Sequence, residues 1–439
     1  MTELRSLRRR VELGLILLTT IVTASAYALA SLGTTASLPA DLVPFLAVVL
    51  GLLICAHLAV RRFAPNADGL MLPLAALLNG IGYVFVARLD NDLAGPQATW
   101  TAIGIGAFIA TLVVVRRPRD LQRYRYTFLV IGVVLLLLPF TPIGFANLGA
   151  QIWVRLGPLT FQPGELAKLA LLLFLAGYLT ENRELLSVST FKVGPLMLPD
   201  PKRLGPLLLA LGGALVIFVQ QNDLGPSLML FTLFLVMIWV VTERLSYLVL
   251  GGGLFLAGAY AAYTQFAHVA PRFEVWLDPW RPEVIRDEAY QIVQATYALA
   301  QGGLTGTGPG LGNPERIPVV TTDFIFAAIG EELGLVGATA ILICFLLLVG
   351  SALRLAVVAD HAYDKVLAVG IGTLIATQAF IIIGGITRLL PLTGIALPFV
   401  SYGGSSLIVN YVLLGLLVRL SDDVTTRQLQ RIERERVPA

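Results

Sequence analysis

The chain has 439 residues, of which 56% are hydrophobic and 13% are charged, and its mean hydropathy is +0.81. Soluble globular proteins carry about 25% charged residues, so this composition excludes a disordered chain, a nucleic-acid-binding domain, a collagen-like fibre and a disulfide scaffold. The net charge of +3 is too small to indicate an acidic partner. Apolar residues occur in long unbroken runs rather than in alternation, which favours a helical membrane protein over an outer-membrane β-barrel.

The apolar runs predict an all-α, polytopic membrane protein with about 12 transmembrane helices, because about 20 apolar residues cross the hydrocarbon layer. The predicted spans are residues 13–32, 42–60, 69–87, 97–115, 127–147, 164–180, 204–220, 224–242, 246–265, 333–352, 366–387 and 397–418. The basic start MTELRSLRRR is typical of a signal peptide, but the apolar run that follows is too long for a signal core, so we expect a retained helix. Residues 324–332 are too short to span and predict a half-helix or an interfacial turn that leads into the tenth span.

The basic residues predict the orientation of these spans. With the N-terminus in the cytoplasm, 23 of the 31 Lys and Arg residues fall on the inside and seven on the outside, while Lys168 lies within a span. This asymmetry agrees with the positive-inside rule. We therefore expect an even number of spans, with both termini in the cytoplasm.

Three regions follow from this pattern. Residues 1–68 contain an N-terminal tail and two helices, residues 69–420 contain the remaining spans, and residues 421–439 form a charged cytoplasmic tail that we expect to be a short helix.

The large extracellular loop 266–323 is rich in Gly, Pro, Trp and charge, and long ordered loops are more often functional than not. Its glycine-rich run, residues 302–312, lacks the lysine of a phosphate-binding loop and predicts a flexible turn. Cys55 and Cys344 are both expected to be small buried side chains.

Two ionisable residues within a span are the first candidates for a site. In FQPGELAKLALLL, Glu165 and Lys168 are three residues apart, which places them on one face of a helix. Charges within the membrane are costly, so these two residues need an explanation. They form either a structural ion pair between helices or a functional site. Lys168 could also bind an anionic lipid head group as a point charge.

Other acids lie near the outer ends of later spans. Asp223 is in the position of a helix N-cap, although it could line a polar cavity. Thr321 or Thr322 can cap the half-helix, with Asp323 favourable in its first turn. The adjacent Glu331 and Glu332 point about 100° apart on a helix, so they cannot easily share one partner, and at least one should face a polar interior.

The outer loop contains interleaved acids and arginines. The acids are Glu274, Asp278, Glu283, Asp287 and Glu288, and the arginines are Arg272, Arg281 and Arg286. The three histidines are scattered and no His–Cys cluster has metal-ligand spacing, so the sequence contains no evident metal site. A carboxylate base beside guanidinium groups suits attack by a hydroxyl with a phosphate leaving group. The alternative interpretation is a solvated, charged loop.

Five strings carry a family resemblance: FQPGELAK, NDLGPSLML, AYQIVQATYALAQGGLTGTGPGLG, IPVVTTDFIFAAIGEELGLVG and PLTGIALPFVSYGGSSLI. At these strings the chain resembles the SEDS (shape, elongation, division and sporulation) family of RodA and FtsW, over roughly residues 70–420. The resemblance implies a core of ten spans, to which the first two helices here are an addition. It does not separate a RodA-like role in elongation from an FtsW-like role in division.

The resemblance implies a peptidoglycan glycosyltransferase in the bacterial cytoplasmic membrane. Such enzymes polymerise lipid II at the outer face, where a sugar 4-hydroxyl attacks the anomeric carbon of the growing chain and undecaprenyl pyrophosphate leaves. The implied partners are a class B penicillin-binding protein and other elongasome or divisome membrane proteins. A divalent cation, Mg or Mn, is a possible cofactor. A lipid II flippase and a non-catalytic scaffold for the penicillin-binding protein are the alternatives.

The resemblance also implies site residues. The family's essential aspartate precedes a Gly-Tyr-Gln string, which here reads Ala289-Tyr290-Gln291, so Asp287 is the favoured catalytic acid and Asp278 of the WLDP string is its rival. WRPEVIRDEAYQ departs from the family pattern of Asp-Pro followed by glycines. The expected substrate-binding residues are Glu165, Lys168, Arg155, Asp223, Asp323, Glu331, Glu332, Ser401 and Tyr402.

Overall fold

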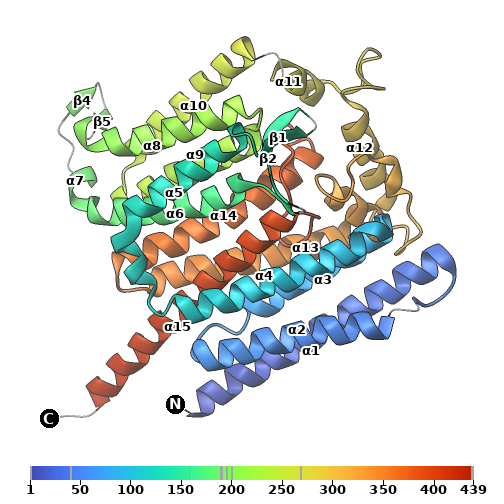
Figure 1. Cartoon of the computed structure of the whole chain (residues 1–439), viewed down its shortest axis with the longest axis horizontal. Coiled ribbons are helices and arrows are strands. Elements are labelled where there is room, and N and C mark those ends of the chain that lie inside the picture. The colour runs from blue at the N-terminus through green and yellow to red at the C-terminus, as the bar shows by residue number, and fades with distance from the viewer. Residues whose placement is uncertain are drawn as a thin grey trace.

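The computed structural model describes residues 2–39, 42–147, 149–157, 159–187, 191–193, 196–198, 201–266 and 269–436. It confirms a helical, polytopic membrane protein (Figure 1). Each predicted span coincides with a helix: α1 (Thr2–Thr35), α2 (Leu42–Phe63), α3 (Met71–Leu89), α4 (Ala94–Val114), α5 (Arg125–Leu137), α6 (Pro163–Glu181), α8 (Pro201–Gln220), α9 (Leu224–Thr242), α10 (Leu245–Gln265), α13 (Ile325–Val358), α14 (Ala362–Ile386) and α15 (Gly404–Arg436). Within the described residues, eleven segments are long and apolar enough to span, and the apolar part of α8, Gly205–Gln220, is shorter.

Short elements connect these helices. On the cytoplasmic side they include η2 (Pro118–Tyr124), α7 (Arg183–Ser187), β4 (Phe191–Val193) and β5 (Leu196–Leu198). On the outer side they are η1 (Asn91–Leu93), η3 (Leu138–Phe140), β1 (Gly144–Asn147), β2 (Ala150–Leu156), β3 (Leu159–Phe161), α11 (Ala270–Leu277), α12 (Tyr290–Gly302) and η4 (Pro314–Arg316). Strands β1, β2 and β3 form an antiparallel sheet in that order, with Val154 opposite both Gly144 and Phe161.

The two ends of the chain lie at the same end of the bundle. In Figure 1 the N and C marks are at the lower left, whereas α11, α12 and the β1–β2 hairpin are at the upper right. This arrangement follows from an even number of crossings. Spans α3, α6, α14 and α15 are largely buried, whereas α5 and α10 expose most of their surface to the surroundings.

Several sequence-based boundaries are wrong. The apolar pattern predicts the fifth span at 127–147, but it occupies Pro118–Phe140, because prolines at 139 and 142 stop the helix and the chain enters the small sheet. The last helix begins at Gly404 rather than near 397 and continues to Arg436. The helical part of the tail is therefore longer than the short helix that the sequence predicts, and it is continuous with the last span. Cys344 is buried as predicted, but Cys55 is exposed on α2.

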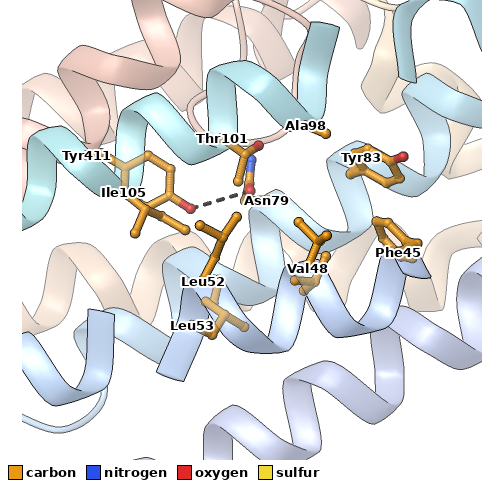
Figure 2. Close-up of a pocket in the computed structure, with 13 residues that line it drawn as sticks. Phe45, Val48, Leu52, Leu53, Asn79, Tyr83, Ala98, Thr101, Ile105 and Tyr411 are labelled. Carbon is orange, nitrogen blue, oxygen red and sulfur yellow. Dashed lines mark hydrogen bonds between the residues drawn. The ribbon is translucent and has the colours of Figure 1, made fainter. Parts of the chain in front are cut away.

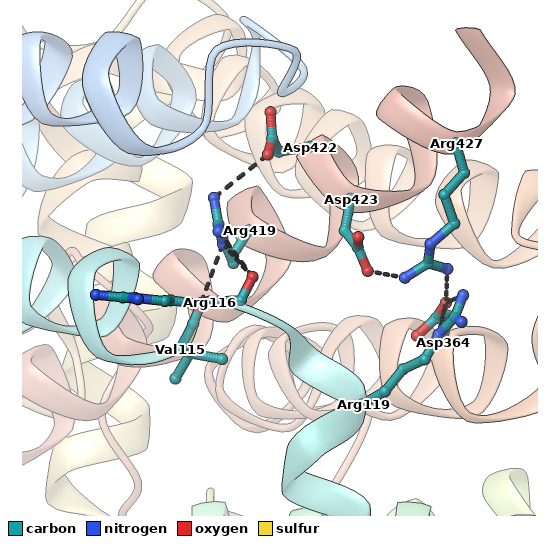
Figure 3. A network of polar contacts seen from close by, with 8 residues as sticks. All are labelled: Val115, Arg116, Arg119, Asp364, Arg419, Asp422, Asp423 and Arg427. Atoms are coloured by element: carbon teal, nitrogen blue, oxygen red, sulfur yellow. Dashed lines mark hydrogen bonds and ion pairs between the residues drawn. The ribbon is translucent and has the colours of Figure 1, made fainter. Parts of the chain in front are cut away.

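A cluster of ion pairs explains why α15 continues beyond the membrane (Figure 3). Asp364, at the start of α14, is fully buried, and its Oδ2 accepts bonds from Arg119 Nε at 3.0 Å, Arg119 Nη2 at 2.9 Å and Arg427 Nη1 at 2.8 Å. Arg427 also pairs with Asp423 on its own helix, and Arg419 donates to the carbonyl oxygens of Val115 and Arg116. Side chains of α15 are thereby fixed to η2 and α14.

The two N-terminal helices form a hairpin that packs on α3 and α4. His57 Nδ1 lies 2.9 Å from Glu12 Oε1, both groups being buried between α1 and α2. A small, mainly apolar pocket remains where α2 meets α3, α4 and α15, and within it the Tyr411 hydroxyl lies 3.4 Å from Asn79 Oδ1 (Figure 2). Asn79 Nδ2 in turn donates to the carbonyl oxygen of Phe399 at 3.1 Å. The hairpin is therefore part of the packed bundle.

The predicted side of the two termini can be tested with reporter fusions. A reporter that is active only outside the cytoplasm should give no signal when it is fused after residue 439, because the distribution of basic residues places that end inside. The same reporter fused near residue 300 should be active, since α12 lies at the opposite end of the bundle. An active reporter at the C-terminus would mean that the span count is odd.

Candidate active site

The outer ends of four helices provide the framework of the site. α6, α9, α13 and α15 all begin at the outer end of the bundle, at Pro163, Leu224, Ile325 and Gly404. The backbone N–H of Gln162, the residue before α6, donates to Ser405 Oγ at 2.9 Å, which ties α6 to the start of α15. Helix N-termini carry a partial positive charge, so this end of the bundle favours anionic groups.

The predicted pair of Glu165 and Lys168 is an ion pair on α6. Lys168 Nζ lies 2.7 Å from Glu165 Oε1, as the spacing on one helix face predicts. Lys168 is only 2% exposed, whereas the Glu165 side chain is 12% exposed. A buried ammonium group is costly unless it is paired, and Glu165 supplies that partner. The ion pair lies within one helix rather than between two.

Asp223 and Asp323 belong to the same electrostatic cluster as this pair. Burial raises the pKa of Asp223 to about 7, the charges of Lys168 and Arg272 act against that shift, and those of Glu165 and Asp323 add to it. Burial likewise raises the pKa of Asp323 to about 6, against the polar side chain of Thr322 and the charge of Arg272. The pKa values of both aspartates are thus closer to neutral pH than that of an ordinary aspartate, and shifted pKa values are common at functional sites.

Asp223 occupies the N-cap position of α9, but its side chain makes no capping hydrogen bond. Asp323 does not lie in the first turn of α13 as expected, because Phe324 is the N-cap, and neither Thr321 nor Thr322 caps the helix. The Thr322 hydroxyl donates instead to the carbonyl oxygen of Val319 at 3.2 Å. Capping therefore does not account for the position of either aspartate.

The segment before α15 holds Asp323 in place. Ser401 Oγ donates to the carbonyl oxygen of Thr322 at 2.5 Å and accepts from the Leu397 N–H at 2.9 Å, and the Tyr402 N–H donates to the carbonyl oxygen of Thr321 at 2.9 Å. Ser401 is 3% exposed, and Tyr402 is half-buried. Through these bonds Ser401 and Tyr402, both predicted from the sequence, support the backbone next to Asp323.

The half-helix predicted at 324–332 exists, and its end is a break inside α13. Gly334 has φ 64° and ψ −167°, which only glycine adopts readily, so α13 consists of two helices. The glycine-rich run fills the break: Thr307 and Gly308 donate to the carbonyl oxygens of Glu331 and Glu332, at 2.9 and 3.0 Å. Leu335 and Val336 donate to the carbonyl oxygens of residues 303 and 304, at 2.9 and 3.1 Å.

The side chains of Glu331 and Glu332 bind the same run. Glu331 Oε1 accepts from the Asn313 N–H at 2.8 Å, and Glu332 Oε2 accepts from the Gly310 N–H at 2.8 Å. Both residues are at most 2% exposed. Each acid therefore has its own partner, as their angular separation predicts. Together they hold the glycine-rich run, which is fixed by hydrogen bonds and is not the flexible turn that the sequence predicts.

Sequence reasoning missed the role of Arg88 at the end of α3. Its side chain is 4% exposed, its Nε lies 2.6 Å from Glu332 Oε1, and its Nη2 donates to the carbonyl oxygen of Gly312 at 3.0 Å. Arg88 also pairs with Glu315. The sequence also did not distinguish Arg272, which belongs to the electrostatic cluster, from the other arginines of the outer loop. The only signal for Arg88 is a charge at the very end of an apolar run.

The remaining predicted residues are exposed on the outer surface. Arg155 is exposed on β2, with its guanidinium carbon 4.8 Å from the ring centre of Phe145. Asp278 is the exposed C-cap residue of α11, and its Oδ1 accepts from the Trp280 N–H at 3.2 Å. Asp287 is exposed in the turn before α12, where its carbonyl oxygen accepts from the Tyr290 N–H at 3.1 Å. Both rival acids are thus open to an external substrate.

Comparisons with known proteins define the family. The sequence profile of the FtsW, RodA and SpoVE family of cell cycle proteins matches residues 70–426. A RodA of Mycobacterium tuberculosis, named a peptidoglycan glycosyltransferase, is 41% identical over 427 residues, covering 94% of this chain and 90% of that protein. A probable peptidoglycan glycosyltransferase FtsW of Geobacter sulfurreducens is 34% identical over 368 residues, covering 81% and 95%.

Solved structures with a similar fold agree with this family assignment. A peptidoglycan synthase complex, described as coordinating polymerisation and crosslinking, contains a chain that aligns with a TM-score of 0.65 at 25% identity, covering 82% of this chain and 98% of that one. RodA of Thermus thermophilus aligns with a TM-score of 0.57 at 24% identity, covering 81% and 97%, and shows the shared fold. The chain belongs to the FtsW/RodA/SpoVE family, as the sequence motifs predicted, and is a multi-pass protein of the bacterial cytoplasmic membrane.

The raised pKa of Asp223 predicts a pH-dependent stability. The ordinary pKa of an aspartate is 3.8, and that of Asp223 in the folded protein is about 7, so between these values the folded state binds more protons than the unfolded state. The stability contributed by this group is therefore lost as pH rises from about 4 to 7. We expect the melting temperature in detergent to fall over this range, and to fall less steeply in Asp223→Asn.

The control for this measurement is Asp278→Asn, which changes an exposed aspartate on the same side of the membrane. This variant should keep the wild-type pH dependence. Equal slopes in Asp223→Asn and the wild type would show that Asp223 is ionised throughout this range.

Proposed function

We propose that this chain is a peptidoglycan glycosyltransferase that polymerises lipid II at the outer face of the membrane. The observation that carries the proposal is the cluster of Lys168, Asp223 and Asp323 at the outer ends of α6, α9 and α13, together with Arg272 of α11. In this proposal, the cations and acids of the cluster would meet the pyrophosphate of a membrane-anchored substrate. The activity named for the 41% identical RodA agrees with this proposal.

In the proposed reaction, the 4-hydroxyl of one sugar attacks the anomeric carbon of the growing chain. The bond from that carbon to the pyrophosphate oxygen breaks, and undecaprenyl pyrophosphate leaves with the bonding electrons. Lys168 and Arg272 would stabilise the charge that develops on the leaving group, supported by the positive ends of α6 and α9. Glu165 would keep Lys168 oriented when no substrate is bound.

A carboxylate must accept the proton of the attacking hydroxyl. We assign this role to Asp287, with Asp278 as the rival, because both are exposed on the outer loop that the acceptor sugar must approach. A positioned general base contributes about 10²–10⁴-fold to a rate. Asp223 and Asp323 lie with the leaving-group cations and would adjust the charge of the cluster by holding or releasing protons.

A divalent cation, Mg or Mn, fits this cluster only together with the substrate. The described residues contain no group of three or more His, Cys, Asp and Glu side chains that could hold a metal ion. Mg²⁺ is commonly held by one or two carboxylates plus substrate phosphates, and Asp223 and Asp323 would supply the protein ligands. The ion would then neutralise charge on the pyrophosphate.

We also propose that a class B penicillin-binding protein is the partner, as part of an elongation or division complex. The chain related by fold is part of a complex described as coordinating polymerisation with crosslinking, and the present chain has no Ser-x-x-Lys string in an outer segment to perform crosslinking itself. A single-pass partner would pack its helix against the bundle, and its outer domain would reach the 266–323 loop.

The direct test is polymerisation of lipid II by purified protein. Asp287→Asn should lower the rate by about 10²–10⁴-fold, because it removes the base but keeps the shape of the side chain. Asp278→Asn is the matched variant and should retain most activity. Thermal unfolding of both proteins in detergent should match the wild type, since both positions are exposed.

The reverse pattern, an inactive Asp278→Asn and an active Asp287→Asn, would move the catalytic role to the rival acid. If folded wild-type protein forms no glycan, alone or with a co-purified penicillin-binding protein, the glycosyltransferase proposal is wrong. In that case a flippase or scaffold role would remain for this chain.

A further inference from the structure

The outer end of α1 touches the glycine-rich run through backbone atoms alone. A Cβ atom added at Gly33 would lie 2.2 Å from the carbonyl oxygen of Pro309, and a Cβ added at Gly310 would lie 2.2 Å from the carbonyl oxygen of Ala30. Gly310 has φ +75°, which also disfavours any other residue. The contact is thus reciprocal, and neither side has room for a side chain.

The same run is what completes α13. Residues 303–308 satisfy the backbone groups that the break at Gly334 leaves open, Glu331 binds the N–H of residue 313, and Glu332 binds the N–H of residue 310. A Cβ at Gly306 would lie 2.2 Å from the carbonyl oxygen of Glu332. A shift of the run would therefore be transmitted to the first half of α13, which begins at Ile325, two residues after Asp323.

α1 is itself fixed to the bundle along its length. A Cβ at Gly80 of α3 would lie 2.2 Å from Thr23 Oγ1, so the two helices approach closely there. Thr19 Oγ1 donates to the carbonyl oxygen of Pro73 at 3.4 Å, and Glu12 pairs with His57 of α2. α1 can thus act as a fixed support, although the whole hairpin lies outside the 70–426 segment that defines the family.

We propose that the α1–α2 hairpin is a positioning element of the enzyme. The contact with α1 holds the glycine-rich run in the break of α13. The run in turn fixes the half-helix that follows Asp323, and so keeps Asp323 in the polar cluster. Gly33 and Gly310 are the positioning residues, because their missing side chains permit this contact. The kinetic consequence rests on the proposed glycosyltransferase function, whereas the structural consequence does not.

The test uses a valine at Gly33 in the full-length protein, with Gly14→Val as the matched control. Both glycines belong to α1, but a Cβ at Gly14 has no atom within 4 Å, whereas a Cβ at Gly33 meets backbone atoms that cannot easily move aside. Hydrogen exchange of the amides in residues 303–313, thermal unfolding, and kcat and KM for lipid II polymerisation are measured for each protein. Gly33→Ala is a milder second variant should the valine prevent folding.

We expect Gly33→Val to accelerate amide exchange in residues 303–313 about tenfold, because the run opens locally while the rest of the bundle stays closed. The kcat should fall about tenfold with KM changed less than about twofold, since misplacement of a catalytic group affects the transition state more than substrate binding. Gly14→Val should match the wild type in every measurement.

Unchanged exchange in residues 303–313 of folded Gly33→Val would overturn the proposal, as would faster exchange with an unchanged kcat. Faster exchange in the variant, together with no glycan synthesis by the wild type, would support the contact and count against the proposed function instead. A general loss of protection across all spans in both Gly33 variants would show that α1 only stabilises the bundle.

Discussion

The break in α13 at Gly334 is the constraint on which the outer half of the molecule depends. Within a membrane, backbone N–H and C=O groups that lose their helical partners must find others, because no water is available to replace them. Here residues 303–308 supply those partners, on both sides of the break. The glycine-rich run is therefore fixed by hydrogen bonds, and its glycines are required because the two backbones nearly touch at Gly306 and Gly334.

Buried charges are arranged around this constraint in separate pairs. Arg88 and Glu332 hold the run beside the break, Lys168 and Glu165 lie at the start of α6, and Asp364 binds two arginines at the cytoplasmic end. Such pairs add little net stability, but removal of one partner leaves an uncompensated charge and costs about 3–5 kcal/mol. The pairs of Arg88 with Glu332 and of Asp364 with its arginines join different elements, whereas the pair of Lys168 with Glu165 lies within α6.

The sequence predicted the helices well because membrane burial imposes one rule on every span. A half-helix or an interfacial turn before Gly334 was also predictable, since a stretch of nine residues is too short to cross the membrane. The β1–β3 sheet was missed because its strands have three to seven residues and follow directly on an apolar run. A helical tail was predicted, but its continuity with the last span was not, because the ion pair that fixes it joins Arg427 to Asp364, 63 residues apart.

The site was only partly predictable for the same reason. Glu165 and Lys168 are neighbours on one helix, so their pairing follows from spacing alone. The roles of Arg88 and Arg272 depend on contacts between distant segments, and the function of the glycine-rich run depends on a break that no local pattern locates. The same limit applies to Gly33, whose importance arises from a contact with Pro309 and Gly310, far along the chain.

The central claim is that the broken helix and the glycine-rich run form one fixed unit that the enzyme needs. It is tested most directly by lipid II polymerisation with purified Gly334→Ala, compared with Gly350→Ala on the same helix. A Cβ at Gly334 would lie 2.2 Å from the Gly306 nitrogen, in a backbone conformation that alanine disfavours, whereas a Cβ at Gly350 has no atom within 4 Å. We predict that folded Gly334→Ala loses about tenfold or more of its rate while Gly350→Ala keeps the wild-type rate. Wild-type polymerisation by Gly334→Ala would contradict the claim.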